Sequence, residues 1–157
     1  MDEPSLSNIK TTGVETYRFL WLRTFDHPIA VRVQNHEGRF LLWSKQLDGK
    51  GGYEPGKLVI NTTKSITAVE WAAFVGHIEQ ASFWTLARLE LERSEVFLRE
   101  VSMDGTMWAL EGLRDGQYHY VDRCLPLSGR IRDCHTKFHN CCLYLLELSG
   151  LKPDIVR

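Results

Sequence analysis

From residue 14 onward, short segments of the chain have the two-residue period of β-strands. The first strand in this pattern has apolar residues on both of its faces, so we expect it in the centre of a sheet. Short turn-like segments separate the first three strands and predict an antiparallel meander. Four strands are predicted, over residues 17–22, 29–34, 39–46 and 57–62.

Two later segments have the period of a helix. Thr67 and Glu70 are spaced as a capping box, in which each side chain accepts a hydrogen bond from the other residue's backbone, and they predict a helix that ends near Ser82. A second helix is predicted over residues 131–149, stopped by Gly150. Its apolar stripe should be buried against the sheet. The stripe consists of Ile131, Cys134, Phe138, Cys141, Cys142 and Leu145.

Residues 104–126 contain the most informative local pattern. Two runs rich in aromatic and β-favouring residues flank Asp115-Gly116, a dipeptide that suits the two left-handed positions of a tight hairpin turn. With this turn Arg114 faces Gln117, and the rest of the register follows. The predicted cross-strand pairs are Gly112–His119, Leu110–Val121 and Trp108–Arg123 on one face, and Glu111–Tyr120 and Ala109–Asp122 on the other.

The order of elements predicts an α+β fold, an antiparallel sheet of about six or seven strands with two helices packed on one face. The optional further strand lies over residues 96–101. Residues 1–12 are expected to be a flexible N-terminal tail, 13–151 a single α+β domain and 152–157 a C-terminal tail. A chain of 157 residues without repeats or linkers is the size of one domain.

Composition and charge exclude several classes of protein. Hydrophobic residues make up 43% of the chain and charged residues 25%, which favours a soluble globular protein over a disordered one. The net charge of −1 provides no field that would attract nucleic acid. No apolar run approaches the ~20 residues of a membrane span. We therefore expect no nucleic-acid partner and no membrane span.

The predicted hairpin carries the candidate ligand-binding residues Trp108, His119 and Arg123. Trp108 opposite Arg123 suits a cation–π contact. Gly112 leaves a gap opposite His119, which could admit a ligand atom or let the imidazole lie flat.

The same hairpin carries three weak candidate catalytic residues, Glu111, His119 and Asp122, with Asp104 as a further member. Glu111 and Asp122 lie diagonally on one face, where two carboxylates could share a proton or a cation. These residue types serve acid–base chemistry and hard-metal binding. The register turns His119 to the opposite face, however. Ordinary cross-strand pairing explains all three residues more simply.

Two further motifs are weak. His135 and His139 are four residues apart on the last predicted helix and could hold zinc, but the intervening Thr136-Lys137-Phe138 lacks the glutamate of the helical zinc-protease motif. A solvated helix edge is favoured there. Residues 49–52, Gly-Lys-Gly-Gly, lack the Gly-Lys-Ser/Thr ending of a phosphate loop, which favours a plain strand connection. We therefore predict no cofactor.

The four cysteines bear on the cellular compartment. Three of them, Cys134, Cys141 and Cys142, fall on the buried stripe and are expected to be reduced, as in a cytoplasmic protein. The alternative is a Cys124–Cys134 disulfide in an exported protein. The polar N-terminal residues do not form a secretory signal, which favours the cytoplasm for the sequence as given. An exported form stays open.

Several segments together resemble a group of uncharacterised bacterial proteins. The resemblance extends over residues 15–151 and implies a bacterial protein, in a group whose members often carry an export signal. It implies no activity and no site residues. The matching segments are ETYRFLWLRTFDHP at 15–28, GGYEPGKL at 51–58, Phe83-Trp84, Asp104-Gly105 with Trp108, Leu110-Glu111-Gly112, YHYVDR at 118–123 and CLYLLELSGL at 142–151.

The functional interpretation favours a non-catalytic binding or protein-interaction module. The charge is near zero, no nucleophile and base stand at a diagnostic spacing, and the predicted sheet is rich in aromatic residues. Five tryptophans and five tyrosines exceed what two helices on a sheet must bury, so some should be exposed to a protein partner. The alternative is a small enzyme or cation-binding protein that uses the carboxylates and histidine of the hairpin.

Overall fold

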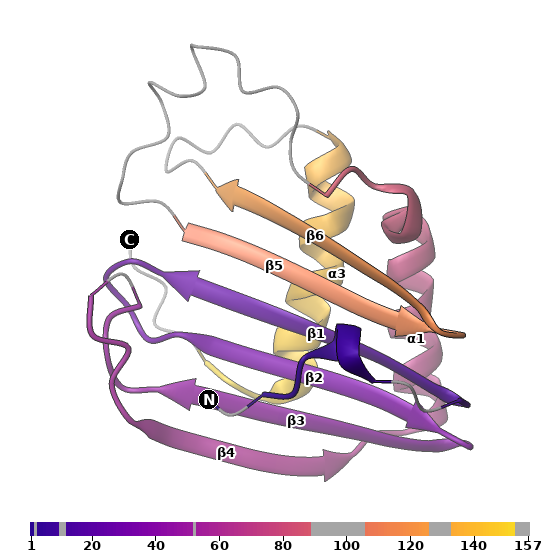
Figure 1. Ribbon diagram of the computed structural model, residues 1–157, viewed down its shortest axis with the longest axis horizontal. Coiled ribbons are helices and arrows are strands. Elements are labelled where there is room, and N and C mark those ends of the chain that lie inside the picture. Colours follow the sequence, from indigo (N-terminus) through magenta and orange to yellow (C-terminus); the bar gives the residue numbers. More distant parts are fainter. Residues whose placement is uncertain (2, 10–11, 52, 89–105, 126–132, 153–157) are drawn as a thin grey trace.

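The computed structural model describes residues 1, 3–9, 12–51, 53–88, 106–125 and 133–152. It shows a six-stranded antiparallel sheet in the order β4-β3-β2-β1-β5-β6, with two helices on one face (Figure 1). This confirms the predicted α+β fold. The optional strand at 96–101 lies outside these ranges. The elements are β1 (Val14–Arg23), β2 (Ile29–His36), β3 (Arg39–Leu47), β4 (Leu58–Ser65), α1 (Ala68–Gln80), β5 (Thr106–Arg114), β6 (Gln117–Leu125) and α3 (Asp133–Ser149), with short 3₁₀ helices η1 (Leu6–Asn8) and η2 (Phe83–Thr85).

Strand β1 is central, as its sequence predicts, because it pairs with β2 on one side and with β5 on the other. Tyr17 and Phe19 are fully buried in the core beneath the helices. Arg18 lies between them and has its side chain on the opposite face. Strand β4 continues past its predicted end at residue 62, since Ser65 still pairs with Leu41 of β3.

The hairpin has the predicted register throughout, from Arg114–Gln117 to Trp108–Arg123. Asp115 and Gly116 take φ angles of 51° and 76°, the left-handed conformation that the turn requires. The dipeptide therefore fixes which side chains of β5 and β6 share a face.

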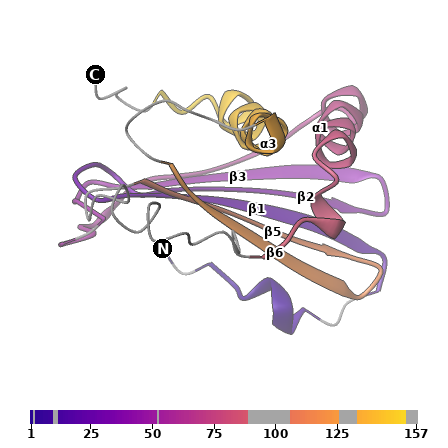
Figure 2. The same ribbon diagram turned by 90° about the horizontal axis from the view of Figure 1, so that it is seen from above.

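The two helices form one layer, and Figure 2 shows both on the same side of the sheet. Thr67 and Glu70 form the predicted capping box at the start of α1. On α3 the described members of the predicted stripe are all fully buried, and Ile131 and the side chain of Cys134 lie outside the described residues. The described members are Phe138, Cys141, Cys142 and Leu145.

The thiols of Cys141 and Cys142 are free and buried. Burial raises the pKa of both thiols above the ordinary value, so they are neutral at physiological pH. They serve as small apolar groups between α3 and the sheet.

The N-terminal segment lies on the other face of the sheet, which we call the open face (Figure 2). Leu6 of η1 is fully buried there. The sequence predicts a flexible tail over residues 1–12. In the structure Glu3 and Leu6 of this segment lie against the sheet, and the flexibility of residues 1–12 stays a prediction.

The first prediction compares two glycines. A Cβ atom on Gly112 would lie 2.8 Å from the rings of Tyr17 and Phe83, whereas one on Gly76 of α1 would meet nothing within 4 Å. Gly112→Ala should therefore lower the free energy of unfolding by about 1–3 kcal/mol through overpacking. Gly76→Ala should raise it by about 0.5–1 kcal/mol, because alanine favours the helix. Urea unfolding measures both. Equal effects at the two sites would contradict the packing around Gly112.

Candidate functional site

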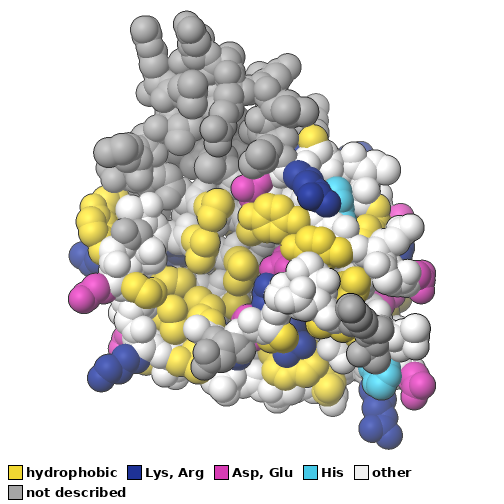
Figure 3. All heavy atoms as spheres, viewed as in Figure 1, with side chains coloured by type: hydrophobic (Ala, Val, Ile, Leu, Met, Phe, Trp, Pro, Cys, Tyr) yellow, Lys and Arg dark blue, Asp and Glu magenta, His cyan; other side chains and the backbone are white. Residues whose placement is uncertain are grey.

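Five charged side chains gather on the open face of the sheet, and we call them the charge cluster. Their side chains are only 7–13% exposed. Figure 3 shows basic and acidic side chains set among apolar ones near the middle of this face. The charge cluster consists of Glu3, Arg18, Arg32, Lys45 and Glu111.

The sheet register brings three members of the charge cluster into one row. Arg18 of β1 is directly opposite Arg32 of β2 and directly opposite Glu111 of β5. Like charges that face each other across two strands repel, so Arg18 and Arg32 need acidic neighbours. Glu111 supplies one negative charge from within the sheet, and Glu3 supplies the other from the N-terminal segment.

Arg18 and Glu111 form a buried ion pair. The Nε and Nη2 atoms of Arg18 donate to Oε1 of Glu111 over 2.9 and 2.5 Å. The hydroxyl of Tyr118 donates to Oε2 over 3.2 Å. Burial, together with the charge of Glu111, raises the pKa of Tyr118 to about 12, so the phenol stays protonated and available as a donor. Both oxygens of Glu111 are therefore engaged.

Glu3 is held by three basic side chains. Its Oε2 lies 3.1 Å from Nε of Arg32 and 3.6 Å from Nη1 of Arg18, and its Oε1 lies 2.8 Å from Nζ of Lys45. Burial lowers the pKa of Arg32, Glu3 opposes this shift and Arg18 adds to it. The guanidinium of Arg32 also lies 3.9 Å above the ring of Trp43. This stacking fixes the donor plane that faces Glu3.

The same basic residues also bind the backbone of the N-terminal segment. Nη1 of Arg18 donates to the carbonyl oxygen of Pro4 over 2.7 Å, and Nζ of Lys45 donates to that of Met1 over 2.7 Å. The open face thus contacts both the acidic side chain and the main chain around it.

His119, a candidate for both ligand binding and catalysis, lies on the helix-covered face, away from Glu111. Its Nε2 is 3.0 Å from the carbonyl oxygen of Leu86, and its ring meets Phe83 edge-on. Burial lowers the pKa of His119, and the charge of Arg88 contributes to the lowering. The gap at Gly112 admits no ligand atom, because the rings of Tyr17 and Phe83 fill it.

The predicted cation–π contact between Trp108 and Arg123 is wrong, although the two residues are cross-strand neighbours. The guanidinium of Arg123 lies 5.8 Å from the ring centre of Phe138 and donates to the carbonyl oxygen of Ala87 over 3.1 Å. Trp108 instead packs on the ring of His139 at 4.6 Å. Helix α3 therefore supplies one ring contact to each residue, while Trp108 also packs on Phe19 and Trp21 of β1.

Glu111 and Asp122 are on the same face, as predicted, but the ion pair with Arg18 engages the carboxylate of Glu111. The backbone N–H of Asp122 donates to the carbonyl oxygen of Arg88. Asp104 lies outside the described residues. The three candidate catalytic residues therefore do not converge on one point of the structure.

Of the two histidines on the last helix, His139 differs from the predicted solvated edge. His139 is buried at 6% exposure, whereas the side chain of His135 lies outside the described residues. Within the described ranges no three side chains of the metal-binding types are grouped.

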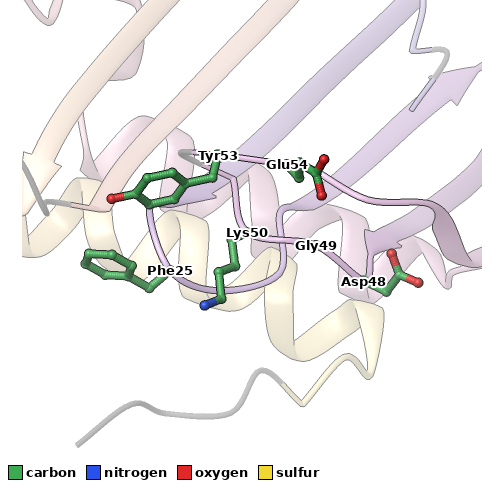
Figure 4. A pocket seen from close by; sticks show the side chains of 6 residues that line it. All are labelled: Phe25, Asp48, Gly49, Lys50, Tyr53 and Glu54. Atoms are coloured by element: carbon green, nitrogen blue, oxygen red, sulfur yellow. The ribbon is translucent and has the colours of Figure 1, made fainter.

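A shallow pocket of about 730 Å³ lies between the β1–β2 and β3–β4 loops, at the segment compared with a phosphate loop. Phe25 and Tyr53 stack there with ring centres 5.9 Å apart and are 48% and 69% exposed. Tyr53 meets the expectation of an exposed aromatic residue. Figure 4 shows the carboxylates of Asp48 and Glu54 turned away from the two rings. The two carboxylates therefore do not face the aromatic pair.

The sequence prediction missed the basic part of the charge cluster. Arg18 and Arg32 occupy one face of two strands that were predicted to be central and half-buried, and a buried arginine needs a counter-charge. This requirement could have predicted a cluster of opposite charges on that face of the sheet. The spacing of residues could not have predicted that Glu3 is the residue that supplies this counter-charge.

Comparison of the chain with protein-family models, curated proteins and solved structures gave no match. No helix in the described part of the chain is long and apolar enough to cross a membrane. The function must therefore be inferred from the site itself.

The second prediction compares two carboxylates that each pair with an arginine. Glu111→Gln should lower the free energy of unfolding by about 3–5 kcal/mol, because it leaves Arg18 buried without its partner in the sheet. Glu79→Gln should cost at most about 1 kcal/mol, because the Glu79–Arg114 pair is exposed to solvent. Urea unfolding of the two variants tests this, and a Glu111→Gln variant as stable as Glu79→Gln would contradict it.

Proposed function

We propose that this protein is a non-catalytic binding module that holds an extended, acidic polypeptide segment of a protein partner on the open face of its sheet. The observation that carries the proposal is the position of Glu3 among Arg18, Arg32 and Lys45. The N-terminal segment occupies this site in the structure as a partner segment would.

Charge balance supports the proposal. The sheet contributes three positive charges to the charge cluster and one negative charge, that of Glu111. Without Glu3 the site would hold an excess of two positive charges on side chains that are nearly shielded from water. Such charges are costly unless they are paired, so the site favours any segment that brings a carboxylate.

The main-chain contacts support recognition of an extended segment. Arg18 and Lys45 donate to carbonyl oxygens on both sides of Glu3, those of Pro4 and Met1. A free carboxylate would satisfy the charge but would leave these two donors without their acceptors. The site therefore fits a peptide better than a small anion.

Apolar side chains on the same face extend the contact surface. Leu20 and Leu22 lie on the same face of β1 as Arg18, and Met107 is opposite Leu22 on β5. All three are partly exposed. An apolar surface beside a charged anchor is typical of protein-binding sites.

The third prediction uses a peptide with the sequence of residues 1–9, MDEPSLSNI, labelled with fluorescein. The full chain carrying Glu3→Gln should bind this peptide at least about tenfold more tightly than the wild type does, because its own segment competes less well for the basic side chains. Fluorescence anisotropy measures the affinity, and circular dichroism checks that the variant is folded.

Two controls belong to this experiment. A peptide that itself carries Glu3→Gln should bind at least about tenfold more weakly, since a charge-assisted hydrogen bond is worth about 1.5–3 kcal/mol. Adding Arg32→Gln to the protein should have the same effect. Absence of saturable binding to the folded Glu3→Gln protein would refute the proposal.

We also propose that the module acts in the cytoplasm of a bacterial cell. The resemblance to bacterial proteins supports the bacterial origin. Cys141 and Cys142 are free thiols in either compartment, so Cys124 and Cys134 decide between them. The fourth prediction is that titration of the unfolded chain finds all four cysteines as free thiols. Two free thiols would instead indicate the Cys124–Cys134 disulfide of an exported protein.

A further inference from the structure

The two edges of the sheet differ in what lies beside them. At β6 the backbone N–H of Asp122 donates to the carbonyl oxygen of Arg88, and the side chains of Arg123 and His119 bond to carbonyl oxygens of residues 86–88. This segment lies along β6 as a partial cover. Strand β4 forms the opposite edge (Figure 1). In the described part of the chain, no backbone hydrogen bond reaches residues 58–65 from a segment other than β3.

Strand β4 is also poor in the features that protect an edge from pairing. It contains no proline, and Lys64 is its single charged residue. The irregularity in its pairing lies at one end, opposite Gln46 and Leu47, and leaves the rest of the strand regular. Leu58 and Val59 are 40% and 55% exposed. Among the described residues no segment pairs with the outward backbone groups of β4, so these groups can hydrogen-bond to another strand.

We propose that β4 pairs with β4 of a second copy of this chain in antiparallel orientation, which joins the two sheets into one. A twofold axis perpendicular to the sheet relates the copies, so each residue contacts its counterpart reciprocally. Residues that face each other across antiparallel strands point to the same side of the sheet. The twofold axis must therefore pass next to a residue that faces its own counterpart in the second copy. Asn61 and Thr62, at the centre of β4, are the two residues that can take this position.

Charge favours a second copy as the occupant of this edge. With the axis at Thr62, Lys64 is opposite Ile60 in the regular part of the strand. With the axis at Asn61, it is opposite Leu58, which lies beyond the irregularity. Lys64 is not opposite its own counterpart in either arrangement, and its aliphatic stem can cover the apolar neighbour. The sequence of the strand therefore places no like charges opposite each other when two copies pair.

The helical layer leaves room for this pairing. Helix α3 packs against β2 and β3, and Figure 2 shows both helices on a single face of the sheet. A second copy beside β4 meets a strand edge in the plane of the sheet. The inference does not depend on the proposed binding of an acidic segment, because it concerns the backbone edge of β4 and not the charge cluster.

The fifth prediction is tested by sedimentation equilibrium of the full chain from micromolar to near-millimolar concentration. The wild type should shift from its monomer mass of 18.1 kDa to twice that mass. The double variant Asn61→Lys/Thr62→Lys should stay monomeric, because it places like charges opposite each other in both arrangements. A matched double variant, Val69→Lys/Leu143→Lys, adds the same charge at exposed helix positions and should dimerise like the wild type.

Two outcomes would overturn the inference. A wild type that stays at 18.1 kDa would leave the edge free for a strand of another protein. A folded Asn61→Lys/Thr62→Lys variant that dimerises like the wild type would place the interface elsewhere. Amide hydrogen exchange of the wild type covers the case in which that variant does not fold. Exchange in β4 should slow as concentration rises, and concentration-independent exchange would also refute the pairing.

Discussion

The buried ion pair between Arg18 and Glu111 is the interaction on which the open face depends. It joins the central strand to the hairpin across a sequence separation of 93 residues. Because β1 has apolar or buried side chains on both of its faces, both faces need cover, and the helices cover only one. An arginine on the other face requires acidic partners close by. Glu111 within the sheet and Glu3 from the N-terminal segment meet this requirement. The N-terminal segment therefore neutralises the buried arginines and covers part of the open face at the same time.

The parts of the structure that follow from local rules could be predicted from the sequence. Asp115-Gly116 specified a turn whose backbone conformation admits one register, and every predicted pair is present. Thr67 and Glu70 specified the start of a helix through two reciprocal hydrogen bonds. The buried stripe of α3 followed from helical spacing alone. In each case the residues that determine the feature are near one another in the sequence.

The parts that depend on distant segments could not be predicted in this way. Gly112 left a gap in the hairpin pattern, but the ring of Phe83 that fills it belongs to η2. Trp108 and Arg123 were correctly placed opposite each other, yet the ring that lies near Arg123, Phe138, and one ring that packs on Trp108, His139, belong to α3. The same holds for the candidate site. The hairpin supplied Glu111, whereas the three basic members of the charge cluster come from β1, β2 and β3, which are distant from the hairpin in the sequence.

The strand order has a consequence for how the chain folds. Strands β1 to β4 form a meander of near neighbours, whose contacts close short loops at small entropic cost. Strand β5 must then find β1 across most of the chain, a contact of high sequence separation that slows folding. During synthesis the meander emerges first, so β1 stands as an unpaired apolar edge until the hairpin is made. The strand that is central in the finished sheet is thus an edge strand of the nascent chain, where it is exposed to aggregation with other chains.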